Sequence, residues 1–305
     1  MLNGVINIYK EQGFTSHDVV AKLRGILKQK KIGHTGTLDP NAEGVLPVCL
    51  GSGTKLCDML TDRDKTYETV LLLGQSTDTQ DTTGTVLERT KVSVTEEMVQ
   101  EAILSFVGAY EQVPPMYSAL KVGGKKLCDL ARAGQEVERK ARPVTIYGIE
   151  ILEVSIPRVR MLVSCSKGTY IRTLCHDIGE KLGCHGCMEK LLRTKAGQFL
   201  LADSLRLSEV EQLRDDGRLE EAVLPVDEVF SALPKAVLKE GSARLGHNGN
   251  PFRNTDLSFQ VTEEGEVRVY DHAGVFLGIY TRHPGQGLYR PVKMFYQNPA
   301  NGQVR

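Results

Sequence analysis

A single aspartate, Asp39, lies between Leu38 and Pro40 in the stretch GHTGTLDPNAEGVLPVCL. A carboxylate held at one fixed angle can act as a nucleophile. Gly33 and Gly36 would let the backbone approach a bound molecule closely, and Pro40 favours an extended conformation at Asp39. The structural alternative is a simple turn, because aspartate before proline is a common turn former. The stretch by itself leaves both interpretations open.

The common catalytic templates do not match elsewhere in the chain. The segment 51–55, GSGTK, lacks the spacing of a P-loop, and Leu56 stands where a dinucleotide-binding fingerprint needs its third glycine. The sequence contains no G-x-S-x-G elbow and no H-E-x-x-H pair. Asp39 also has no second carboxylate placed nearby to form an acid/base pair. Nucleotide-cofactor, hydrolase and metalloprotease chemistry are therefore disfavoured.

Seven cysteines are scattered along the chain, and an odd number without a secretion signal favours reduced thiols. Three of them cluster with two histidines at 175–187, a stretch that ends in CHGC. A structural zinc site needs two well-spaced ligand pairs, but the second pair here would be the adjacent residues Cys175 and His176. Met188 stands where a c-type haem signature requires histidine. A zinc or thiol enzyme is therefore a minor alternative, and no metal is predicted.

The composition is that of an ordinary globular protein, with 41% hydrophobic and 25% charged residues among 305. No apolar run reaches the roughly 20 residues of a membrane helix, and the N-terminus lacks a signal-peptide pattern, so we expect a cytoplasmic protein without membrane contact. The 38 basic residues balance the 38 acidic ones, but basic residues dominate 19–38 and 121–142, and acids dominate 202–228. The basic segments could bind a phosphate backbone or could be solvated surfaces.

Hydrophobic periodicity predicts an α+β protein. After a strand at 4–10, Ser16 is expected to cap a helix whose apolar residues recur at helical spacing from Val19 to Leu27. Further strands are predicted at 66–74, 84–92, 143–156 and 159–166, and helices after Thr95 and from about Tyr170 to Leu182. Short β patterns from about Leu233 predict a small all-β domain. The central sheet should be mixed or antiparallel, because strands and helices do not alternate as in βαβ repeats.

Six stretches together resemble the TruB family of tRNA pseudouridine synthases. Besides the stretch around Asp39, and in the order and spacing typical of that family, they are NIYKEQGFTSHDVV, DKTYE, VPPMYSALKVGGKKLCDLARAG, KGTYIRTLCHDIGEKLGC and EKLLRTKAG. The resemblance covers roughly residues 3–200. It implies a pseudouridine-synthase fold in a catalytic domain at 1–230, with a tRNA-gripping insert at about 110–142. Residues 231–305 resemble a small RNA-binding module of the PUA type.

The family resemblance implies isomerisation of one uridine in the tRNA T-loop, at position 55. The base would be detached from its ribose through N1, turned and rejoined through C5, without a cofactor or metal. Asp39 would be the nucleophile, attacking either C1′ of the ribose or C6 of the uracil. Extruding a base costs a few kcal/mol, and stacking on aromatic side chains recovers about 1–3 kcal/mol per base. The expected partner is the T-arm of tRNA, bound by a monomer without an obligatory protein partner.

The resemblance also assigns roles to eight further residues. Tyr67 would stack on the uracil and serve the C5 proton transfer, and Arg172 would pair with Asp39. The substrate-binding set comprises His34 beneath the flipped nucleotides, Tyr170 and Leu191 in the base pocket, Lys10 behind the site, and Lys125 and Lys126 on the insert. Because an opposite charge lowers the pKa of a carboxyl group, Arg172 is expected to keep Asp39 ionised. The planar guanidinium of Arg172 would also orient the Asp39 carboxylate.

Two positions depart from the family pattern: Glu11 replaces the proline that usually follows Lys10, and Leu192 stands where an arginine often precedes Arg193. Two other functions are compatible with the same motifs. A noncatalytic RNA-binding protein could retain the fold, but the complete set of three catalytic residues disfavours it. A guide-RNA-directed synthase subunit is the other alternative, and the insert favours direct binding of tRNA instead.

Overall fold

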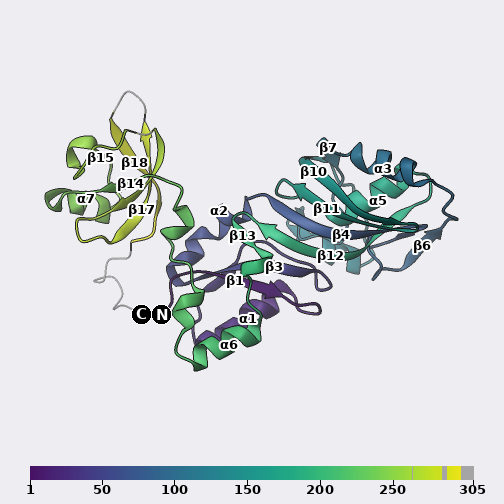
Figure 1. Cartoon of the computed structure of the whole chain (residues 1–305), viewed down its shortest axis with the longest axis horizontal. Coiled ribbons are helices and arrows are strands. Elements are labelled where there is room, and N and C mark those ends of the chain that lie inside the picture. Colours follow the sequence, from purple (N-terminus) through teal and green to yellow (C-terminus); the bar gives the residue numbers. More distant parts are fainter. Residues whose placement is uncertain (263, 284–286, 297–305) are drawn as a thin grey trace.

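The computed structural model describes residues 1–262, 264–283 and 287–296. Within these residues the chain forms one sheet of nine strands, a second sheet of five strands and two short hairpins. Figure 1 shows the two larger sheets at opposite ends of an elongated molecule. The predicted α+β class, with a central sheet and a smaller C-terminal β unit, is confirmed.

The larger sheet has the strand order β1-β3-β12-β4-β11-β10-β7, with β2 paired to β3 and β13 to β12. All neighbouring strands are antiparallel except β12 and β3, which are parallel, so the sheet is mixed as predicted. The strand bounds are β1 Gly4–Lys10, β2 Ile32–His34, β3 Glu43–Leu50, β4 Lys65–Leu73, β7 Gly108–Gln112, β10 Arg142–Ser155, β11 Arg158–Cys165, β12 Gly186–Ala196 and β13 Phe199–Leu200.

Helices cover the two halves of this sheet in separate groups (Figure 1). α3 and α5 enclose one apolar core with β4, β10, β11 and β12, and α1 and α6 enclose another with β1 and β3. The helix bounds are α1 Ser16–Leu27, α2 Cys57–Thr61, α3 Glu96–Leu104, α4 Leu127–Arg132, α5 Ile171–Lys181, α6 Leu207–Asp215 and α7 Ala243–His247. Among the described residues, no helix combines the length and apolarity needed to span a membrane.

The start of α1 differs from the prediction in a way that matters for the site. Thr15, not Ser16, is the N-cap: its hydroxyl accepts from the Asp18 N–H at 3.1 Å, and the Asp18 carboxylate accepts from the Thr15 N–H at 2.8 Å. The prediction that Ser16 caps the helix is wrong, because Asp18 forms this reciprocal capping box with Thr15. Ser16 is buried instead, and its hydroxyl accepts from the Leu38 N–H at 2.9 Å.

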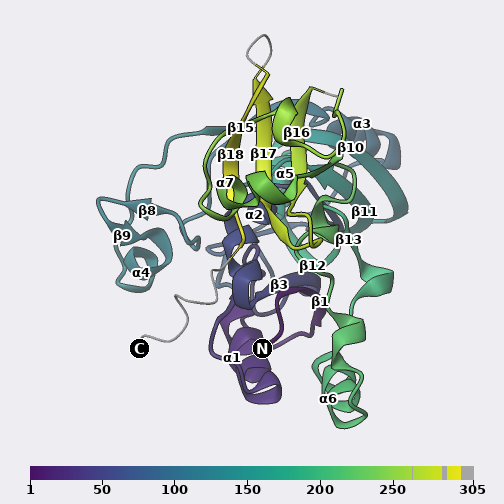
Figure 2. The ribbon, with the colours of Figure 1, turned by 90° about the vertical axis from the view of Figure 1, so that its left-hand side faces the viewer.

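Two hairpins extend from the larger sheet. β5 (Gln75–Thr77) and β6 (Val86–Arg89) follow β4, and β6 is shorter than the predicted strand at 84–92 because Thr85 donates its N–H to Asp78 inside the turn, at 2.7 Å. The second hairpin, β8 (Lys121–Val122) and β9 (Lys125–Lys126), is followed by α4 between β7 and β10. Figure 2 shows β8, β9 and α4 projecting away from the body of the molecule.

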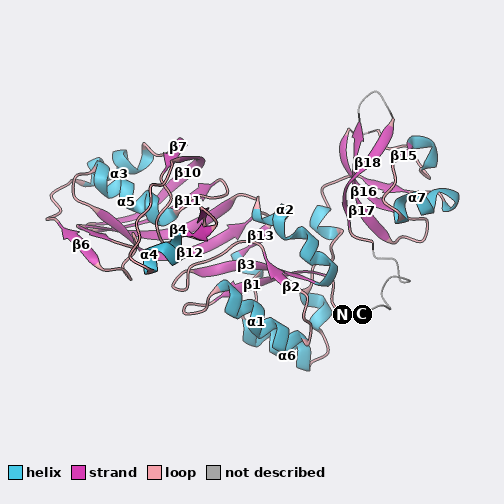
Figure 3. Ribbon diagram, turned by 180° about the vertical axis from the view of Figure 1, so that it is seen from behind, coloured by secondary structure: helices cyan, strands magenta, loops and turns pink. Residues whose placement is uncertain are grey.

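The C-terminal sheet has the order β14-β16-β17-β18-β15 and lies on the far side of α2 from the larger sheet (Figure 3). Its strands are β14 Lys235–Val237, β15 Phe252–Arg253, β16 Gly265–Tyr270, β17 Phe276–His283 and β18 Leu288–Met294. It has its own apolar core, and Ile279 and Phe295 also pack against Leu56 and Leu60 of the larger unit. The boundary between 230 and 231 stays a prediction, and the expected end at 305 lies outside the described residues.

Candidate active site

Asp39 lies on the connection between β2 and β3, and hydrogen bonds hold the residues on both sides of it. On one side, Ser16 accepts from the Leu38 N–H. On the other side, the Pro40 carbonyl accepts from the Gly13 N–H at 2.8 Å and from Lys10 Nζ at 3.1 Å. The segment after β1 therefore fixes the backbone around the carboxylate, while 41% of the Asp39 side chain stays exposed.

Lys10 lies beneath this connection with no exposed surface. Its ammonium donates to the carbonyls of Glu11, Phe14 and Pro40 at 3.2, 2.6 and 3.1 Å. Burial lowers the pKa of Lys10 to about 8, and the nearby carboxylates oppose this shift. An ammonium has three N–H donors, and all three are used inside the protein. The sequence grouped Lys10 with the substrate-binding residues, but the structure places it where it can support the loop and not contact RNA.

Arg172, in the first turn of α5, joins three segments at the site. Its Nε lies 3.1 Å from Asp39 Oδ2, and its Nη1 lies 3.7 Å from Asp81 Oδ2. The same guanidinium donates to the carbonyls of Thr79 at 3.0 Å and Tyr117 at 2.8 Å. With its side chain only 7% exposed, Arg172 is fixed by the β5–β6 turn and the root of the insert while it faces Asp39.

Asp81 is a second carboxylate at the site, and the sequence interpretation missed it. It lies in the turn STDTQDTTG, where its Oδ1 accepts from the Thr83 N–H and from the hydroxyls of Thr79 and Thr83, at 2.9, 2.8 and 2.6 Å. These contacts leave Oδ2 directed at Arg172. Alternating threonine and aspartate signals a side-chain-stabilised turn, but nothing in that pattern places it beside Asp39.

The charge balance at Asp39 also differs from the sequence argument. Burial raises the pKa of Asp39 above its ordinary range, Asp81 adds to the rise, and the cations of Arg172 and Lys10 oppose it. We expected Arg172 to dominate and lower this pKa. The opposite direction arises because surrounding protein atoms desolvate the carboxylate, so Arg172 limits the rise and orients the group.

Tyr67 and Tyr170 lie near Asp39 on two elements, and Leu191 lies on a third. Tyr67 is on β4, Leu191 is on the neighbouring strand β12, and Tyr170 is the N-cap residue of α5. All three are half-buried, and Tyr67 and Leu191 border the same apolar core. Burial raises the pKa of both tyrosines, and the charge of Asp39 contributes to both shifts. Both phenols therefore lie within electrostatic reach of the carboxylate.

His34 ends β2 and packs edge-to-face against His17 of α1, with ring centroids 5.3 Å apart. Its Nδ1 accepts from the Gly36 N–H at 3.3 Å. Burial and the neighbouring His17 lower the pKa of His34 below its usual value, so the ring is uncharged at neutral pH. A neutral, flat ring at the mouth of the loop suits stacking on a base. The sequence interpretation did not single out His17.

Comparison with known proteins identifies the family. The model of the TruB family pseudouridylate synthase N-terminal domain matches residues 24–171, and that of the tRNA pseudouridylate synthase B C-terminal domain matches 172–231. A tRNA pseudouridine synthase B of Lachnoclostridium phytofermentans is 54% identical, covering 96% of this chain and all of its own. One of Bacillus licheniformis is 45% identical, covering 97% and 99%. The chain belongs to the TruB family.

Solved structures support the same fold. A chain in the crystal structure of a Cbf5–Nop10–Gar1 complex has a TM-score of 0.73 at 26% identity, covering 96% of this TruB-family chain and 85% of its own. A chain of an H/ACA ribonucleoprotein bound to a substrate RNA containing 2′-deoxyuridine has a TM-score of 0.72 at 24% identity, which is a likeness of fold. The predicted pseudouridine-synthase fold is therefore confirmed.

Lys125 and Lys126 are not part of the cluster around Asp39. Both are exposed on the projecting hairpin, beside a groove of about 500 Å³ that Lys121 and Asp129 also line. Among the sequence-predicted residues of this TruB-family protein, Lys10, Tyr67, Tyr170 and Arg172 thus interact with Asp39, whereas Lys125 and Lys126 lie on the projecting hairpin.

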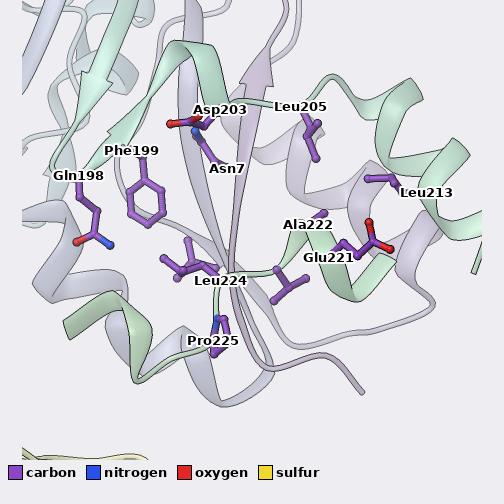
Figure 4. Close-up of a pocket in the computed structure, with 12 residues that line it drawn as sticks. Asn7, Gln198, Phe199, Asp203, Leu205, Leu213, Glu221, Ala222, Leu224 and Pro225 are labelled. Carbon is purple, nitrogen blue, oxygen red and sulfur yellow. The ribbon is translucent and has the colours of Figure 1, made fainter. Parts of the chain in front are cut away.

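A larger cavity, of about 660 Å³, lies between β1 and the segment 198–225 (Figure 4). Asn7, Phe199 and Leu224 are among its lining residues, and none of the nine residues to which the TruB resemblance gives a role is. Concavity alone often marks a binding site, but the carboxylates, the arginine and the aromatic side chains of this TruB-family chain converge at Asp39. We therefore place the candidate active site there.

The CHGC stretch has a structural explanation. Cys184 and Cys187 are buried, and the ring of His185 lies 2.6 Å from Glu180 and 3.0 Å from Glu88. All seven cysteines are free thiols. In the ranges that the structure describes, no three Cys, His, Asp or Glu side chains are grouped so that they could hold a metal ion. The zinc alternative thus lacks a geometric basis.

Proposed function

We propose that this chain is a tRNA pseudouridine synthase that isomerises the T-loop uridine at position 55. Relatives that share about half of its residues over their full length carry the name tRNA pseudouridine synthase B, which supports the substrate class. The observation that carries the proposal is the 3.1 Å ion pair between Arg172 and Asp39, because the loop of Asp39 is hydrogen-bonded on both sides. Such preorganisation suits a nucleophile that must meet its target at one angle.

In this mechanism an extruded uridine enters beside Asp39, and the carboxylate attacks C1′ or C6. Arg172 orients the carboxylate and opposes the pKa rise that burial causes. Tyr67 stacks on the base and serves the transfer of the C5 proton, with Tyr170 and Leu191 as the walls of the pocket. After the base is detached through N1 and turned, C5 bonds to C1′ and the covalent bond to Asp39 breaks. C5 then loses its proton and N1 gains one, which gives pseudouridine.

The remaining residues bind the RNA or support the loop of Asp39. His34 stacks under the neighbouring flipped nucleotides, which its uncharged ring favours. Lys125 and Lys126 contact the phosphate backbone of the T-arm, because exposed lysines on a projecting hairpin can reach it. Lys10 acts indirectly through the carbonyl of Pro40.

The decisive test is tritium release from tRNA that carries 5-tritiated uridine. We expect Asp39→Asn to abolish release while tRNA affinity stays within about tenfold, or about 1.4 kcal/mol, of the wild type. Asp203→Asn, an exposed aspartate at the separate cavity, is the matched control and should turn over normally. Similar turnover by wild type and Asp39→Asn would contradict the proposal.

A guide-RNA-dependent subunit is the second candidate, and one observation favours it: the similar chain of known structure was solved with Nop10 and Gar1. We favour direct action of a monomer on free tRNA, because the projecting insert offers its own basic contacts. Turnover of a tRNA transcript by the purified protein alone would support this choice. A requirement for a guide RNA or a partner protein would favour the alternative.

A further inference from the structure

Arg193 on β12 is a buried cation that the proposed mechanism leaves unexplained. It is 1% exposed and has the largest volume of the fully buried side chains in the described part of the chain. In residues 1–262, 264–283 and 287–296, no carboxylate oxygen lies within 4.0 Å of a guanidinium nitrogen of Arg193, so Arg193 has no ion-pair partner there. Burying an unpaired charge is costly, so its retention here calls for a role in the site.

The contacts of Arg193 lead to both ends of the Asp39 loop. Its Nε donates to the Val45 carbonyl at 2.6 Å, and its Nη2 lies 3.4 Å from the Gly36 carbonyl. The backbone of Arg193 also presses against Gly44, where a methyl group would lie 2.3 Å from the Arg193 carbonyl oxygen. The guanidinium is therefore fixed where β12 meets the loop.

Arg193 is also the direct cross-strand partner of Tyr67. The register of β12 against β4 pairs the two residues, which places their Cβ atoms about 4.5–5.5 Å apart on one face of the sheet. The charge of Arg193 opposes the rise that burial causes in the pKa of Tyr67. A guanidinium only donates hydrogen bonds, so a hydrogen bond between the two side chains would run from Arg193 to the phenol oxygen and leave the phenol O–H for another partner.

We propose that Arg193 is a positioning residue that holds the Tyr67 hydroxyl for the C5 proton transfer. This inference rests on the proposed function. Once C5 has joined C1′, the C5–H bond breaks and its electron pair becomes the C5=C6 double bond. The pair of the former C6=N1 double bond returns to N1, which takes a proton from solvent. The C5 proton passes to a water molecule that the Tyr67 hydroxyl anchors.

The test compares kcat on tRNA that carries protium or deuterium at C5 of the target uridine. We expect Arg193→Met to lower kcat about 100-fold, equivalent to about 2.7 kcal/mol, with little change in the KM for tRNA. The deuterium isotope effect on kcat should rise from near unity to a full primary effect, because proton loss becomes rate-limiting. Arg193→Lys, which keeps the charge but not the planar fork, should recover part of the rate.

A double-mutant cycle separates this role from a structural one. In a Tyr67→Phe background, Arg193→Met should change kcat by no more than about twofold. The reason is that the hydroxyl through which Arg193 acts is already absent. The exposed Arg160 on β11, paired with Glu68 at 3.1 Å, gives the matched control Arg160→Met, which should behave as wild type. If Arg193→Met does not fold, as judged by circular dichroism, Arg193→Lys carries the isotope measurement and the cycle.

An unchanged isotope effect, or an equal loss of kcat in the wild-type and Tyr67→Phe backgrounds, would overturn the proposal. These outcomes differ from those expected if the proposed function is wrong. If the proposed function is wrong, the wild type will release no tritium, or Asp39→Asn will release as much as the wild type. If only this inference fails, the wild type stays active and Asp39→Asn inactive while the cycle is additive.

Discussion

The loop that carries Asp39 and the insert that carries Lys125 and Lys126 are held in different ways. The loop accepts hydrogen bonds from Lys10 and Arg193 and donates one to Ser16, and these three residues belong to three separate elements. The hydrogen bonds of β8, β9 and α4 that the structure describes stay within the insert. A nucleophile needs one fixed angle, whereas lysines that bind a phosphate backbone need reach and access to solvent.

The two regions nevertheless meet at the start of α5. The Gln112 side chain, at the start of the insert, accepts from the Tyr170 N–H at 2.7 Å and donates to the Tyr170 carbonyl at 3.0 Å. Arg172 donates to the Tyr117 carbonyl inside the insert. The root of the insert thus belongs to the site, and only its tip is independent. A change at the tip should therefore alter binding, and a change at the loop should alter stability and chemistry.

The largest effect is expected from a methyl group at Gly44. This residue has a φ of +103°, and the added carbon would lie 2.3 Å from a backbone oxygen, so Gly44→Ala should cost about 2–5 kcal/mol of unfolding free energy. At the hairpin glycine Gly123, with a φ of +57° and no atom within 4 Å, alanine should cost only about 1–2 kcal/mol. Urea denaturation measures both, and equal costs would refute the contrast.

Ser16→Ala should affect chemistry more than folding. It leaves the buried Leu38 N–H without its acceptor, and we expect kcat to fall about tenfold, or about 1.4 kcal/mol, as Asp39 loses its fixed angle. Thr15→Ala is the control, because it removes the helix cap, worth about 1 kcal/mol, but not the contact with the loop. Single-turnover rates on tRNA would compare them. A similar kcat in both variants would argue against positioning by Ser16.

The pH dependence should reflect the raised pKa of Asp39. The ionised nucleophile is lost as pH falls through this raised pKa, so the acidic limb of kcat/KM should lie above the ordinary range of aspartate. Asp81→Asn removes a neighbouring negative charge that raises the pKa further, so the limb should move to lower pH, whatever the change in maximal rate. A limb that moves upward or stays fixed in this variant would show that Asp81 does not act on Asp39 electrostatically.

The smallest effect on chemistry is expected at the insert tip. In Lys125→Ala/Lys126→Ala, the slope of log affinity against log salt should flatten by about 1–2, because two phosphate contacts are lost. The kcat at saturating tRNA should stay at the wild-type level. Lys91→Ala, an exposed lysine outside the insert, should leave the slope unchanged. A steep, unaltered slope in the double variant would remove the hairpin from the interface.

Most local structure was predictable because its causes lie within a few residues. The strand at 4–10, the hairpin around Pro157 and the helix capped by Thr95 match β1, β10–β11 and α3. The error at Ser16 has the same origin: two adjacent hydroxyl residues compete to cap α1, and the buried contact with Leu38 that occupies Ser16 is remote in sequence.

The amino-acid sequence by itself determined the periodic elements, the family motifs and the residue types at the site. Only the tertiary structure decided that Asp81 faces Arg172, that Lys10 is sealed beneath the loop, and that burial outweighs Arg172 in setting the pKa of Asp39. The reason is physical. Desolvation and the choice of partner depend on which distant segments the sheet register brings together, and no local pattern of residues encodes that environment.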